Sequence, residues 1–352
     1  MNPARAPRSA IVIGGGVIGL FTAWRLSDAG FKVTLIERDQ VAAAAMGAAS
    51  WAAGGILSPL PPWQATAAVW SLAAESIRSY PAIAAELAEA TGIDPEWTAS
   101  GMWVLDPDGE HAAEQAAAAD WSGDHNMPVR NGRCPLALGR DASGLWLPWV
   151  AQLRSPRLCQ ALALRLRQLG VLIEEQSPVQ ALRIEGDRVA LAATGDCPDV
   201  VVVCAGAWST PLLAPLHWPQ SIAPVRGQML LFRAEPGVLD TIVLDRDHYL
   251  IPRRDGRILV GSTLEPEAGF DARTTEAARQ SLQAFALGLL PALAAYPIEA
   301  QWAGLRPGSP DGMPTIARHP QLSNLYLNAG HYRNGLTLAP ASATRLLGLI
   351  TA

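Results

Sequence analysis

The sequence has few cysteines, and none of them forms the close pairs that structural zinc sites need. Its four cysteines, Cys134, Cys159, Cys197 and Cys204, are scattered along 352 residues without a Cys-x-x-Cys motif. This spacing argues against a disulfide framework and against structural zinc, and it favours reduced thiols in the cytoplasm. We therefore expect a cytoplasmic protein without a metal site.

Long apolar runs, basic clusters and hydrolase motifs are also missing. No run reaches the roughly 18 apolar residues that a membrane-spanning helix needs. Lysine and arginine number 27 against 32 aspartates and glutamates, and no basic cluster is long enough to follow a phosphate backbone, so nucleic acid is not an expected partner. The Gly-x-Ser-x-Gly motif that carries the nucleophile of many serine hydrolases does not occur.

The composition does provide enough apolar residues for a large ordered core. Apolar residues make up 49% of the chain and charged residues 17%, which is typical of globular proteins and not of disordered ones. A chain of 352 residues also exceeds the usual size of a single hydrophobic core. We therefore expect two domains, or one domain with a large insertion.

Residues 10–38 have the pattern of a strand, a glycine-rich loop, a helix and a second strand. The loop carries the motif Gly14-x-Gly16-x-x-Gly19 in the context that identifies a dinucleotide-binding unit. Gly14 permits a tight turn, Gly16 lets the backbone approach a pyrophosphate, and Gly19 lets the helix pack closely on the strand. The second strand ends at Glu37, which can accept hydrogen bonds from a ribose.

The beginning of the predicted helix, at Val17 and Ile18, is expected to face the phosphates. The first N–H groups of a helix have no partner within the helix, and the helix dipole places a partial positive charge there.

Three further features favour FAD over NAD, which the glycine motif alone does not separate. The loop at residues 49–55, with sequence ASWAAGG, is rich in small residues that suit an isoalloxazine ring and its ribityl chain. Small residues, Ala205 and Gly206, again follow the apolar run at 200–203. A second Gly-x-Gly-x-x-Gly motif for a nicotinamide cofactor is absent, so we expect the electrons to come from a substrate.

Residues 328–340, with sequence NAGHYRNGLTLAP, suggest a second helix start that meets the same cofactor. Two glycines bracket Arg333, and the spacing predicts a helix over 336–349. Its positive end would stabilise the negative charge of a reduced flavin. One extended FAD could then contact both ends of the chain. The alternative is a surface turn before a packing helix, which gives Arg333 no role.

The sequence therefore predicts an α/β fold, α+β overall, with a Rossmann-like FAD-binding domain and an inserted substrate domain. We expect a parallel central sheet in the FAD-binding domain, assembled from residues 1–65, 150–215 and 298–352. Alternating polar and apolar residues at 224–264 predict an antiparallel sheet for the substrate domain, which takes residues 66–149 and 216–297. Residues 66–92 are predicted as one long helix or two short ones, and 93–149 as irregular structure with short strands.

The motifs GGGVIG, ER, ASWAAGG, CAGAW, WAGLRPGSPDGMP and GHYRNGLTLAP together resemble the glycine oxidases of thiamine biosynthesis, within the D-amino-acid oxidase superfamily. The motifs follow the family order over nearly the whole chain. The resemblance implies an FAD flavoprotein that oxidises glycine, sarcosine and small D-amino acids by hydride transfer from the α-carbon to the flavin. The imine product either hydrolyses to glyoxylate and ammonia, with dioxygen reduced to hydrogen peroxide, or passes to thiazole synthesis. Thiazole synthase and a second copy of this chain are the protein partners considered.

The resemblance also implies roles for three residues at the substrate. Arg306 would pair with the substrate carboxylate, Tyr249 would donate a hydrogen bond to it, and Arg333 would assist. A guanidinium fork suits a carboxylate because it makes two parallel hydrogen bonds. Relatives specialised for larger D-amino acids have glycines where Tyr332 and Arg333 stand, so these side chains are expected to narrow the pocket.

Hydride departure requires a neutral amine, and the nearby cationic arginines favour loss of the ammonium proton. No dedicated base is therefore required, and neither His248 nor His331 is assigned as one. The chain departs from the family pattern at VAAAAMGAAS (residues 41–50), which lacks the polar and basic residues often found before the flavin loop. This departure bears on the affinity for the cofactor.

The residues expected to contact FAD come from the glycine loop, the acidic strand end, the small-residue loops and the C-terminal helix start. They are Gly14, Gly16, Val17, Ile18, Gly19, Glu37, Arg38, Ala49, Ser50, Ala53, Gly54, Gly55, Val179, Ala205, Gly206, Trp208, Gly330, His331, Tyr332, Arg333, Asn334, Gly335, Leu336 and Thr337.

Two other functions remain open from the sequence. One is an FAD-dependent D-amino-acid dehydrogenase that passes electrons to a quinone at the membrane, although no basic amphipathic anchor is evident. The other is a flavin-bearing partner in thiazole assembly with negligible turnover of free glycine.

Overall fold

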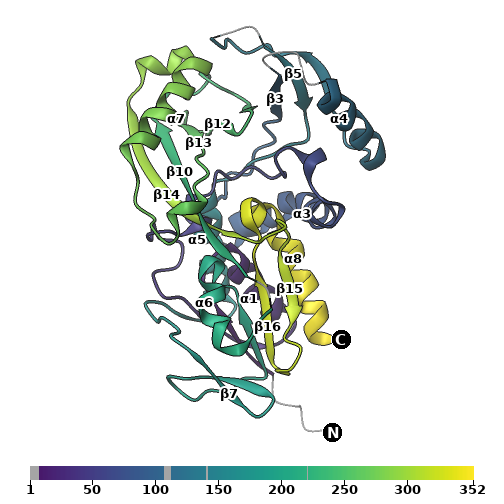
Figure 1. The fold of residues 1–352 in the computed structure, drawn as a ribbon, viewed down its shortest axis with the longest axis vertical. Coiled ribbons are helices and arrows are strands. Elements are labelled where there is room, and N and C mark those ends of the chain that lie inside the picture. Colours follow the sequence, from purple (N-terminus) through teal and green to yellow (C-terminus); the bar gives the residue numbers. More distant parts are fainter. Residues whose placement is uncertain (1–7, 107–111, 140–141, 220) are drawn as a thin grey trace.

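The computed structural model describes residues 8–106, 112–139, 142–219 and 221–352, which form two large sheets with helices around them (Figure 1). The lower half of the view holds a six-stranded sheet in the order β15-β16-β9-β1-β2-β6. Its strands are β1 (Ser9–Ile13), β2 (Lys32–Ile36), β6 (Leu172–Glu174), β9 (Val200–Val203), β15 (Thr315–Arg318) and β16 (Leu325–Ala329). All neighbours in it are parallel except β15 and β16.

The centre of this sheet follows the predicted strand, loop, helix and strand. Strand β1 pairs in parallel with β2 and β9, with Ala10 opposite both Val33 and Val200. All four residues of β9 are buried, as expected of a continuous apolar run in a sheet that is covered on both faces. Helix α1 (Val17–Asp28) connects β1 to β2 and ends before Gly30, whose φ of 81° is the left-handed conformation typical of a helix end.

The upper half of the molecule contains an eight-stranded sheet in the order β14-β10-β13-β12-β11-β3-β5-β4 (Figure 1). Its strands are β3 (Met102–Asp106), β4 (Arg130–Arg133), β5 (Ser143–Leu147), β10 (Ala223–Phe232), β11 (Ile242–Asp245), β12 (His248–Pro252), β13 (Ile258–Gly261) and β14 (Ile298–Gly308). Neighbouring strands are antiparallel except β11 and β3. This confirms the predicted antiparallel sheet.

The remaining elements cover these sheets. Helix α7 (Glu276–Leu289) packs Leu282 and Ala286 against apolar residues of β10 and β13. Strands β7 (Leu182–Glu185) and β8 (Arg188–Leu191) form a separate hairpin. The shorter elements are α2 (Ala49–Ala52), α6 (Ser209–Leu213), η1 (Pro62–Gln64), η2 (Gly206–Trp208), η3 (Ala214–Leu216), η4 (Pro266–Ala268), η5 (Pro291–Ala295) and η6 (Tyr332–Asn334).

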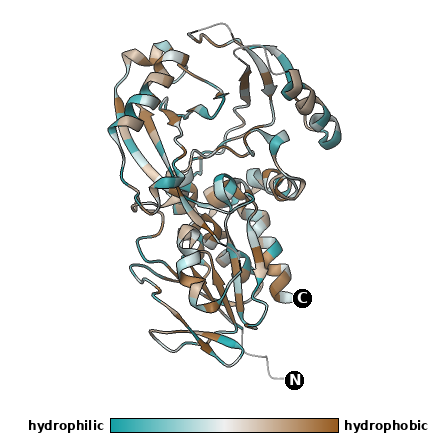
Figure 2. Ribbon diagram, viewed as in Figure 1, coloured by the Kyte–Doolittle hydropathy of each residue, from teal (hydrophilic) through white to brown (hydrophobic). Residues whose placement is uncertain are grey.

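Four helices share one apolar core with the six-stranded sheet. They are α1, α3 (Ala67–Thr91), α5 (Ser155–Gln168) and α8 (Gly335–Thr351), and they contact one another directly. Phe21, Tyr80, Leu162 and Leu346 come from these helices and pack with the strand residue Val202. Figure 2 shows apolar residues along the strands and the inward sides of these helices. The N-terminal and C-terminal segments therefore lie side by side.

The structure differs from the sequence expectation in three places. Residues 112–125, within the segment predicted as irregular, form helix α4 (Ala112–His125). Helix α3, which was placed with the substrate domain, packs on α8 and α5 next to the six-stranded sheet. Strand β14, which was placed with the FAD-binding domain, pairs with β10 in the eight-stranded sheet. The division of the chain into two domains stays a prediction.

Within the described ranges, no helix is both long enough and apolar enough to cross a membrane bilayer.

Candidate active site

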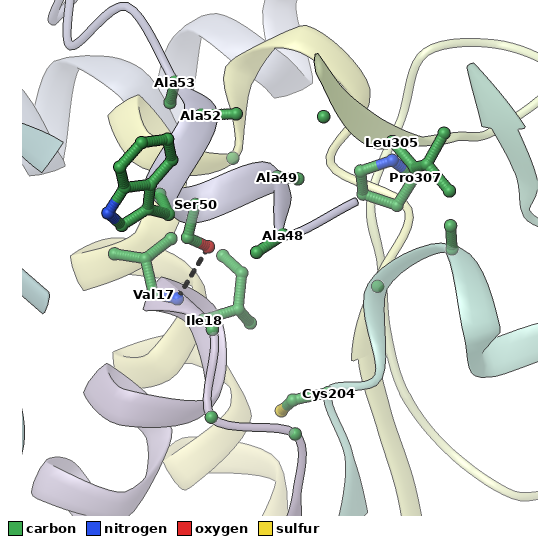
Figure 3. A pocket seen from close by; sticks show the side chains of 18 of the residues that line it. Val17, Ile18, Ala48, Ala49, Ser50, Ala52, Ala53, Cys204, Leu305 and Pro307 are labelled. Atoms are coloured by element: carbon green, nitrogen blue, oxygen red, sulfur yellow. Dashed lines mark hydrogen bonds between the residues drawn. The ribbon is translucent and has the colours of Figure 1, made fainter. Parts of the chain in front are cut away.

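A cavity of about 550 Å³ is lined by residues of both sheets and both ends of the chain. Its walls include the loop after β1, the segment after β2, residues 48–56, the residues after β9, and the beginning of α8. Figure 3 shows Ile18 and Cys204 on one side of this space, Ala48 and Ala49 above it, and Leu305 and Pro307 across from them. The cavity lies at the carboxyl ends of the parallel strands β1 and β9, which is where such folds bind ligands.

The glycine loop has the geometry that the motif predicts. Gly14 has a φ of 111°, and a Cβ atom there would lie 2.4 Å from the backbone oxygen of Cys204. A Cβ atom on Gly19 would lie 1.8 Å from the backbone oxygen of Gly14. The first glycine therefore makes the turn, and the third lets α1 pack on the loop. Gly16 is the N-cap of α1 and offers no side chain to its first turn.

The beginning of α1 keeps free N–H groups toward the cavity. The Val17 N–H donates to Ser50 Oγ at 2.9 Å, as the dashed line in Figure 3 marks. The regular helical hydrogen bonds begin at Leu20, whose N–H donates to the Gly16 carbonyl. Among the described residues, the N–H group of Ile18, which lines the cavity, has no acceptor, so this helix start can bind a phosphate.

Glu37 and Arg38 follow β2 along the cavity wall. Glu37 accepts the N–H of Gly15 at 2.5 Å and that of Asp39 at 3.1 Å, so its carboxylate is held beside the glycine loop. The Arg38 guanidinium lies over the Trp208 ring, 3.6 Å from its centroid. Both residues were expected at the cofactor from the sequence, and the structure shows in addition that their side chains stack on each other at the cavity wall.

The small-residue loop is held by a side chain that sequence analysis missed. Arg253 donates to the backbone oxygens of Gly54 at 2.8 Å and Leu153 at 3.1 Å, and to Gln152 Oε1 at 2.9 Å. Burial lowers the pKa of Arg253 to about 10, so it stays charged near neutral pH. A Cβ atom on Gly54 would lie 3.3 Å from the Tyr249 hydroxyl. The loop therefore lies against β12 of the eight-stranded sheet.

The beginning of α8 reaches the same cavity, at Gly335 and Leu336. Its N-cap, Asn334, makes no side-chain hydrogen bond to the first turn. Thus two helix starts from opposite ends of the chain, α1 and α8, face one cavity, and neither N-cap residue caps its helix with its own side chain.

Helix α3 holds this beginning of α8 in place. Pro340 has no N–H group, so the Leu336 carbonyl four residues earlier lacks its usual helical partner. The Tyr80 hydroxyl donates to that carbonyl instead, and Ser76 Oγ accepts the N–H of Ala341 at 3.1 Å. A proline that would weaken an isolated helix is therefore matched by two polar residues of α3.

Two polar side chains that line the cavity have a buried atom without a partner among the described residues. Asn328 donates to Thr22 Oγ1 at 3.1 Å, while its Oδ1 is unpartnered. His331 Nε2 lies 3.0 Å from Ser342 Oγ, while its Nδ1 is unpartnered. Burial lowers the pKa of His331 to about 3, so the ring is neutral. Buried polar atoms normally have partners, and these two suit a ligand that carries polar groups.

The cavity thus passes a test of fit for FAD. It offers free N–H groups at two helix starts, glycines where a side chain would collide, and polar atoms that lack partners. The residues that would hold the cofactor are those of the loop after β1, the loop before and within α2, and the beginning of α8.

A second cavity of about 210 Å³ adjoins the first. Tyr249, Arg306 and Arg333 line both cavities. The structure therefore brings together the three residues assigned to the substrate, although they come from β12, β14 and η6. Residues lining the second cavity also include Leu60, Pro61, Gln64, Ser262, Tyr332 and Asn334.

Arg306 is a cation without an anionic partner among the described residues. Its Nη1 donates to the backbone oxygens of Thr263 at 3.2 Å and Arg226 at 3.4 Å, and its Nη2 donates to Ser262 Oγ at 2.7 Å. Burial lowers the pKa of Arg306; Tyr249 opposes this shift, while the positive charge of Arg333 reinforces it. An anion in the adjoining cavity would relieve this electrostatic cost.

A glycine that sequence analysis missed makes room for this guanidinium group. Gly227 lies in β10 beside β14, and a Cβ atom there would lie 2.0 Å from Arg306 Nη1 and 2.3 Å from its central carbon. The guanidinium group therefore lies directly against the backbone of Gly227.

The other two assigned residues differ in burial. Tyr249 is buried, and its hydroxyl donates to Met229 Sδ at 3.5 Å. Arg333 is exposed, and it makes no hydrogen bond or ion pair within the described ranges. Burial lowers the pKa of His248, which the lining residues of the two cavities do not include. These facts agree with assigning no base to His248.

The structure places most of the expected cofactor residues on the wall of the first cavity. Four of them do not line it: Gly19, Gly330, Asn334 and Thr337. Gly19 lies beneath the loop, and Asn334 borders the second cavity. The Gly330 carbonyl accepts from Ser309 Oγ at 3.0 Å, and Thr337 Oγ1 donates to the Ile56 carbonyl at 3.2 Å. Gly330 is therefore bound to the segment after β14, and Thr337 to the segment that follows the loop at residues 49–55. Their role at the cofactor stays a prediction.

Comparison with known proteins places this site in a family. The family model described as DAO, FAD dependent oxidoreductase, matches residues 9–347. The chain is 44% identical to the glycine oxidase of Pseudomonas aeruginosa, over 97% of this chain and 94% of that protein. It is 32% identical to the bifunctional protein ThiO/ThiG of Trichormus variabilis, over 97% of this chain and 52% of that protein.

A solved structure has the same architecture. The crystal structure of glycine oxidase from Geobacillus kaustophilus superposes with a TM-score of 0.90 at 28% identity, covering 98% of this chain and 95% of that one. The match of the family model over nearly the whole chain, together with the two helix starts that face one cavity, confirms the predicted fold and cofactor. The chain belongs to the FAD-dependent oxidoreductase family.

Proposed function

We propose that this protein is a glycine oxidase, which converts glycine, water and dioxygen to glyoxylate, ammonia and hydrogen peroxide. When bound, FAD supplies the two-electron acceptor for the hydride that leaves the α-carbon. One observation carries the proposal. Arg306, a half-buried cation without an anionic partner in the described part of the chain, lies where the cofactor cavity meets the smaller cavity. The full-length similarity to a glycine oxidase supports the same function.

Arg306 would bind the carboxylate of the amino acid. A guanidinium group and a carboxylate form parallel charge-assisted hydrogen bonds, which set the orientation of the substrate as well as its affinity. The buried Tyr249 lies on the wall of both cavities, where its hydroxyl can turn from Met229 to the carboxylate. With the carboxylate held at two points, the α-carbon is directed toward the cofactor cavity, and such positioning can supply much of a rate enhancement.

The substrate amine must be neutral when the hydride leaves. Arg306 and Arg333 place two positive charges at the cavity, and like charges favour the neutral form of the bound amine. His331 stays neutral because burial lowers its pKa to about 3, so it adds no charge of its own. The chain therefore promotes loss of the ammonium proton to water without a dedicated base.

The small cavity suits a substrate with little or no side chain. Its volume is about 210 Å³, and Leu60, Tyr332 and Arg333 are among the side chains that enclose it. Glycine, sarcosine and small D-amino acids are the proposed substrate class.

We also propose that the product supports thiazole synthesis in thiamine production, with dioxygen as the electron acceptor. The relative from Trichormus variabilis, which this chain matches over about half of its length, bears the name ThiO/ThiG. That name supports a functional link between the activity of this chain and a second activity carried by the rest of that bifunctional protein.

Anaerobic titration of the FAD-loaded protein with glycine tests the proposal. We expect glycine to bleach the visible absorption of the protein, and we expect admitted air to restore the colour with formation of hydrogen peroxide and glyoxylate. Failure of glycine, sarcosine and D-alanine to bleach the protein would contradict the proposal. A protein that stays bleached in air but is reoxidised by a quinone would show the dehydrogenase instead.

A further inference from the structure

The hydrogen bonds of Arg306 leave one edge of its guanidinium group available. Five N–H donors are present. Nη1 donates to the backbone oxygens of Arg226 and Thr263, and Nη2 donates to Ser262 Oγ. Among the described residues, Nε–H donates in none of these hydrogen bonds, and the Tyr249 hydroxyl lies close enough to Arg306 to favour its charged form. In a guanidinium group, Nε–H and one N–H of Nη2 lie side by side and parallel, which is the arrangement that a carboxylate accepts in bidentate fashion.

Ser262 provides the shortest of the three contacts, at 2.7 Å, and the one to a side chain. It follows β13 directly, is 6% exposed, and lines the second cavity. The other two acceptors are backbone oxygens, which remain whatever side chains the chain carries there. Ser262 is therefore the position where a substitution can release Nη2 while the rest of the support stays.

The two backbone acceptors belong to a rigid support. Arg226 and Glu265 pair through Nε at 2.9 Å and Nη2 at 2.5 Å, and their backbones exchange hydrogen bonds of 3.2 and 3.0 Å. Thr263 Oγ1 donates to Glu265 Oε1 at 2.5 Å. Gly227 closes the other face, because its missing Cβ atom is what lets the guanidinium group lie there. Nη1 is thus held, and rotation of the rigid guanidinium plane about Nη1 is the remaining freedom.

The charge of Arg333 makes this freedom consequential. Its positive charge lies close enough to Arg306 to lower the pKa of that group, so the two cations repel each other. Without an acceptor behind Nη2, repulsion and thermal motion would turn the free edge away from the orientation that receives a carboxylate. A hydrogen bond from a charged donor to a hydroxyl counters such a rotation.

We propose that Ser262 is a positioning residue, which fixes the guanidinium of Arg306 so that its Nε and Nη2 edge faces the substrate cavity. This inference rests on the proposed function, in which Arg306 binds the substrate carboxylate. Ser262 acts through Arg306 and not on the substrate itself. It thereby sets the affinity for the carboxylate, and it leaves the events at the α-carbon unchanged once the substrate is bound.

Acetate provides the direct test, because it has the carboxylate of glycine but no amine to oxidise. The dissociation constant of acetate is measured with the FAD-loaded protein from the change in its visible absorption, for the parent and for Ser262→Ala, Ser262→Thr and Arg306→Met. Ser79→Ala is the matched control, since its hydroxyl also makes one hydrogen bond within the protein, to the Ser76 carbonyl, but lies in α3 away from both cavities.

We expect Ser262→Ala to raise the acetate dissociation constant and the KM for glycine by about tenfold, the effect of losing one charge-assisted hydrogen bond. The kcat and the melting temperature should stay near those of the parent. Ser262→Thr keeps the hydroxyl and should restore most of the affinity, while Ser79→Ala should change nothing.

Three results would overturn the inference. Unchanged acetate affinity in Ser262→Ala, beside loss of acetate binding in Arg306→Met, would remove Ser262 and leave the proposed function standing. Unchanged acetate affinity in Arg306→Met would remove the carboxylate site itself, and the proposed function with it. A fold decrease in kcat as large as the fold increase in KM, together with a lower melting temperature, would show that Ser262 serves the fold and does not position Arg306.

Discussion

The two ends of the active site are built in different ways. At the cofactor end, backbone groups of continuous segments form the wall: the glycine loop, residues 49–55 and the beginning of α8. At the substrate end, residues far apart in the sequence converge on Arg306, including Gly227, Tyr249 and Ser262. A backbone site depends on local conformation, whereas a side-chain site depends on how strands pair. The two ends should therefore respond differently to substitution.

Arg306→Met should have the largest effect and should separate the two ends. Removing the cation from a half-buried carboxylate site should lower kcat/KM for glycine on the order of 10³-fold, while the affinity for FAD stays unchanged. Steady-state kinetics and FAD titration of the apoprotein measure the two quantities. Arg183→Met is the control, because Arg183 lies exposed in the β7–β8 hairpin. Equal loss of FAD affinity and activity would show that the ends are not separate.

Gly227→Ala should break the substrate end without loss of the fold. The added Cβ atom would lie 2.0 Å from Arg306 Nη1, and the flexible guanidinium group can move away. Misplacement of a binding group by about 1 Å can cost about 10²-fold in rate, and we expect a fall of that size in kcat/KM. The melting temperature should change little. Gly123→Ala, at an exposed site in α4 with open space around it, is the control. Full activity in Gly227→Ala would contradict the placement of Arg306.

Gly14→Ala should affect the cofactor end instead. The φ of 111° disfavours any side chain, and the new Cβ atom would meet the Cys204 backbone oxygen at 2.4 Å. Backbone strain of this kind costs about 1–3 kcal/mol, so FAD affinity should fall by about 5-fold to 150-fold. Gly30→Ala tests strain alone, because its φ is 81° but nothing lies within 4 Å. If Gly30→Ala weakened FAD binding equally, general strain and not the loop would explain the result.

The pH dependence of stability concerns the wall between the two ends and neither end itself. Burial lowers the pKa of His331 to about 3 from the ordinary histidine value of 6.5. Between these values the unfolded chain binds a proton that the folded protein does not. Stability from this residue is therefore complete above pH 6.5 and falls by about 1.4 kcal/mol per pH unit as the pH drops toward 3.

Urea unfolding of the parent and of His331→Gln at pH 7, 6 and 5 isolates this contribution from that of the carboxylates. We expect the difference in unfolding free energy between the two proteins to shrink as the pH falls. A constant difference would mean that His331 is charged or accessible in the folded protein.

Sequence analysis succeeded where the signal is local. Gly14, Gly16 and Gly19 lie within six residues and carry their roles in the backbone, and the alternation of polar and apolar residues in β10, β12 and β13 indicated an antiparallel sheet. The apolar run of β9 likewise indicated a buried central strand. Each of these features depends on near neighbours in the chain.

It failed where the partner lies far away. Gly227 matters because it faces Arg306, 79 positions later in the sequence, and Arg253 because it reaches the carbonyl of Gly54. No local pattern marks either residue. Helix α4 was missed for another reason: its run of alanines favours a helix, but few of its residues are buried, so the periodicity that indicates a packed helix is weak.

A crystal structure of the protein with FAD and acetate would test the central claim most directly, since it shows both ends of the site at once. We predict that the pyrimidine edge of the flavin lies against the N–H groups at the beginning of α8, and that the acetate carboxylate accepts hydrogen bonds from Nε and Nη2 of Arg306. A flavin ring away from α8, or acetate bound elsewhere with Arg306 turned to solvent, would contradict the account.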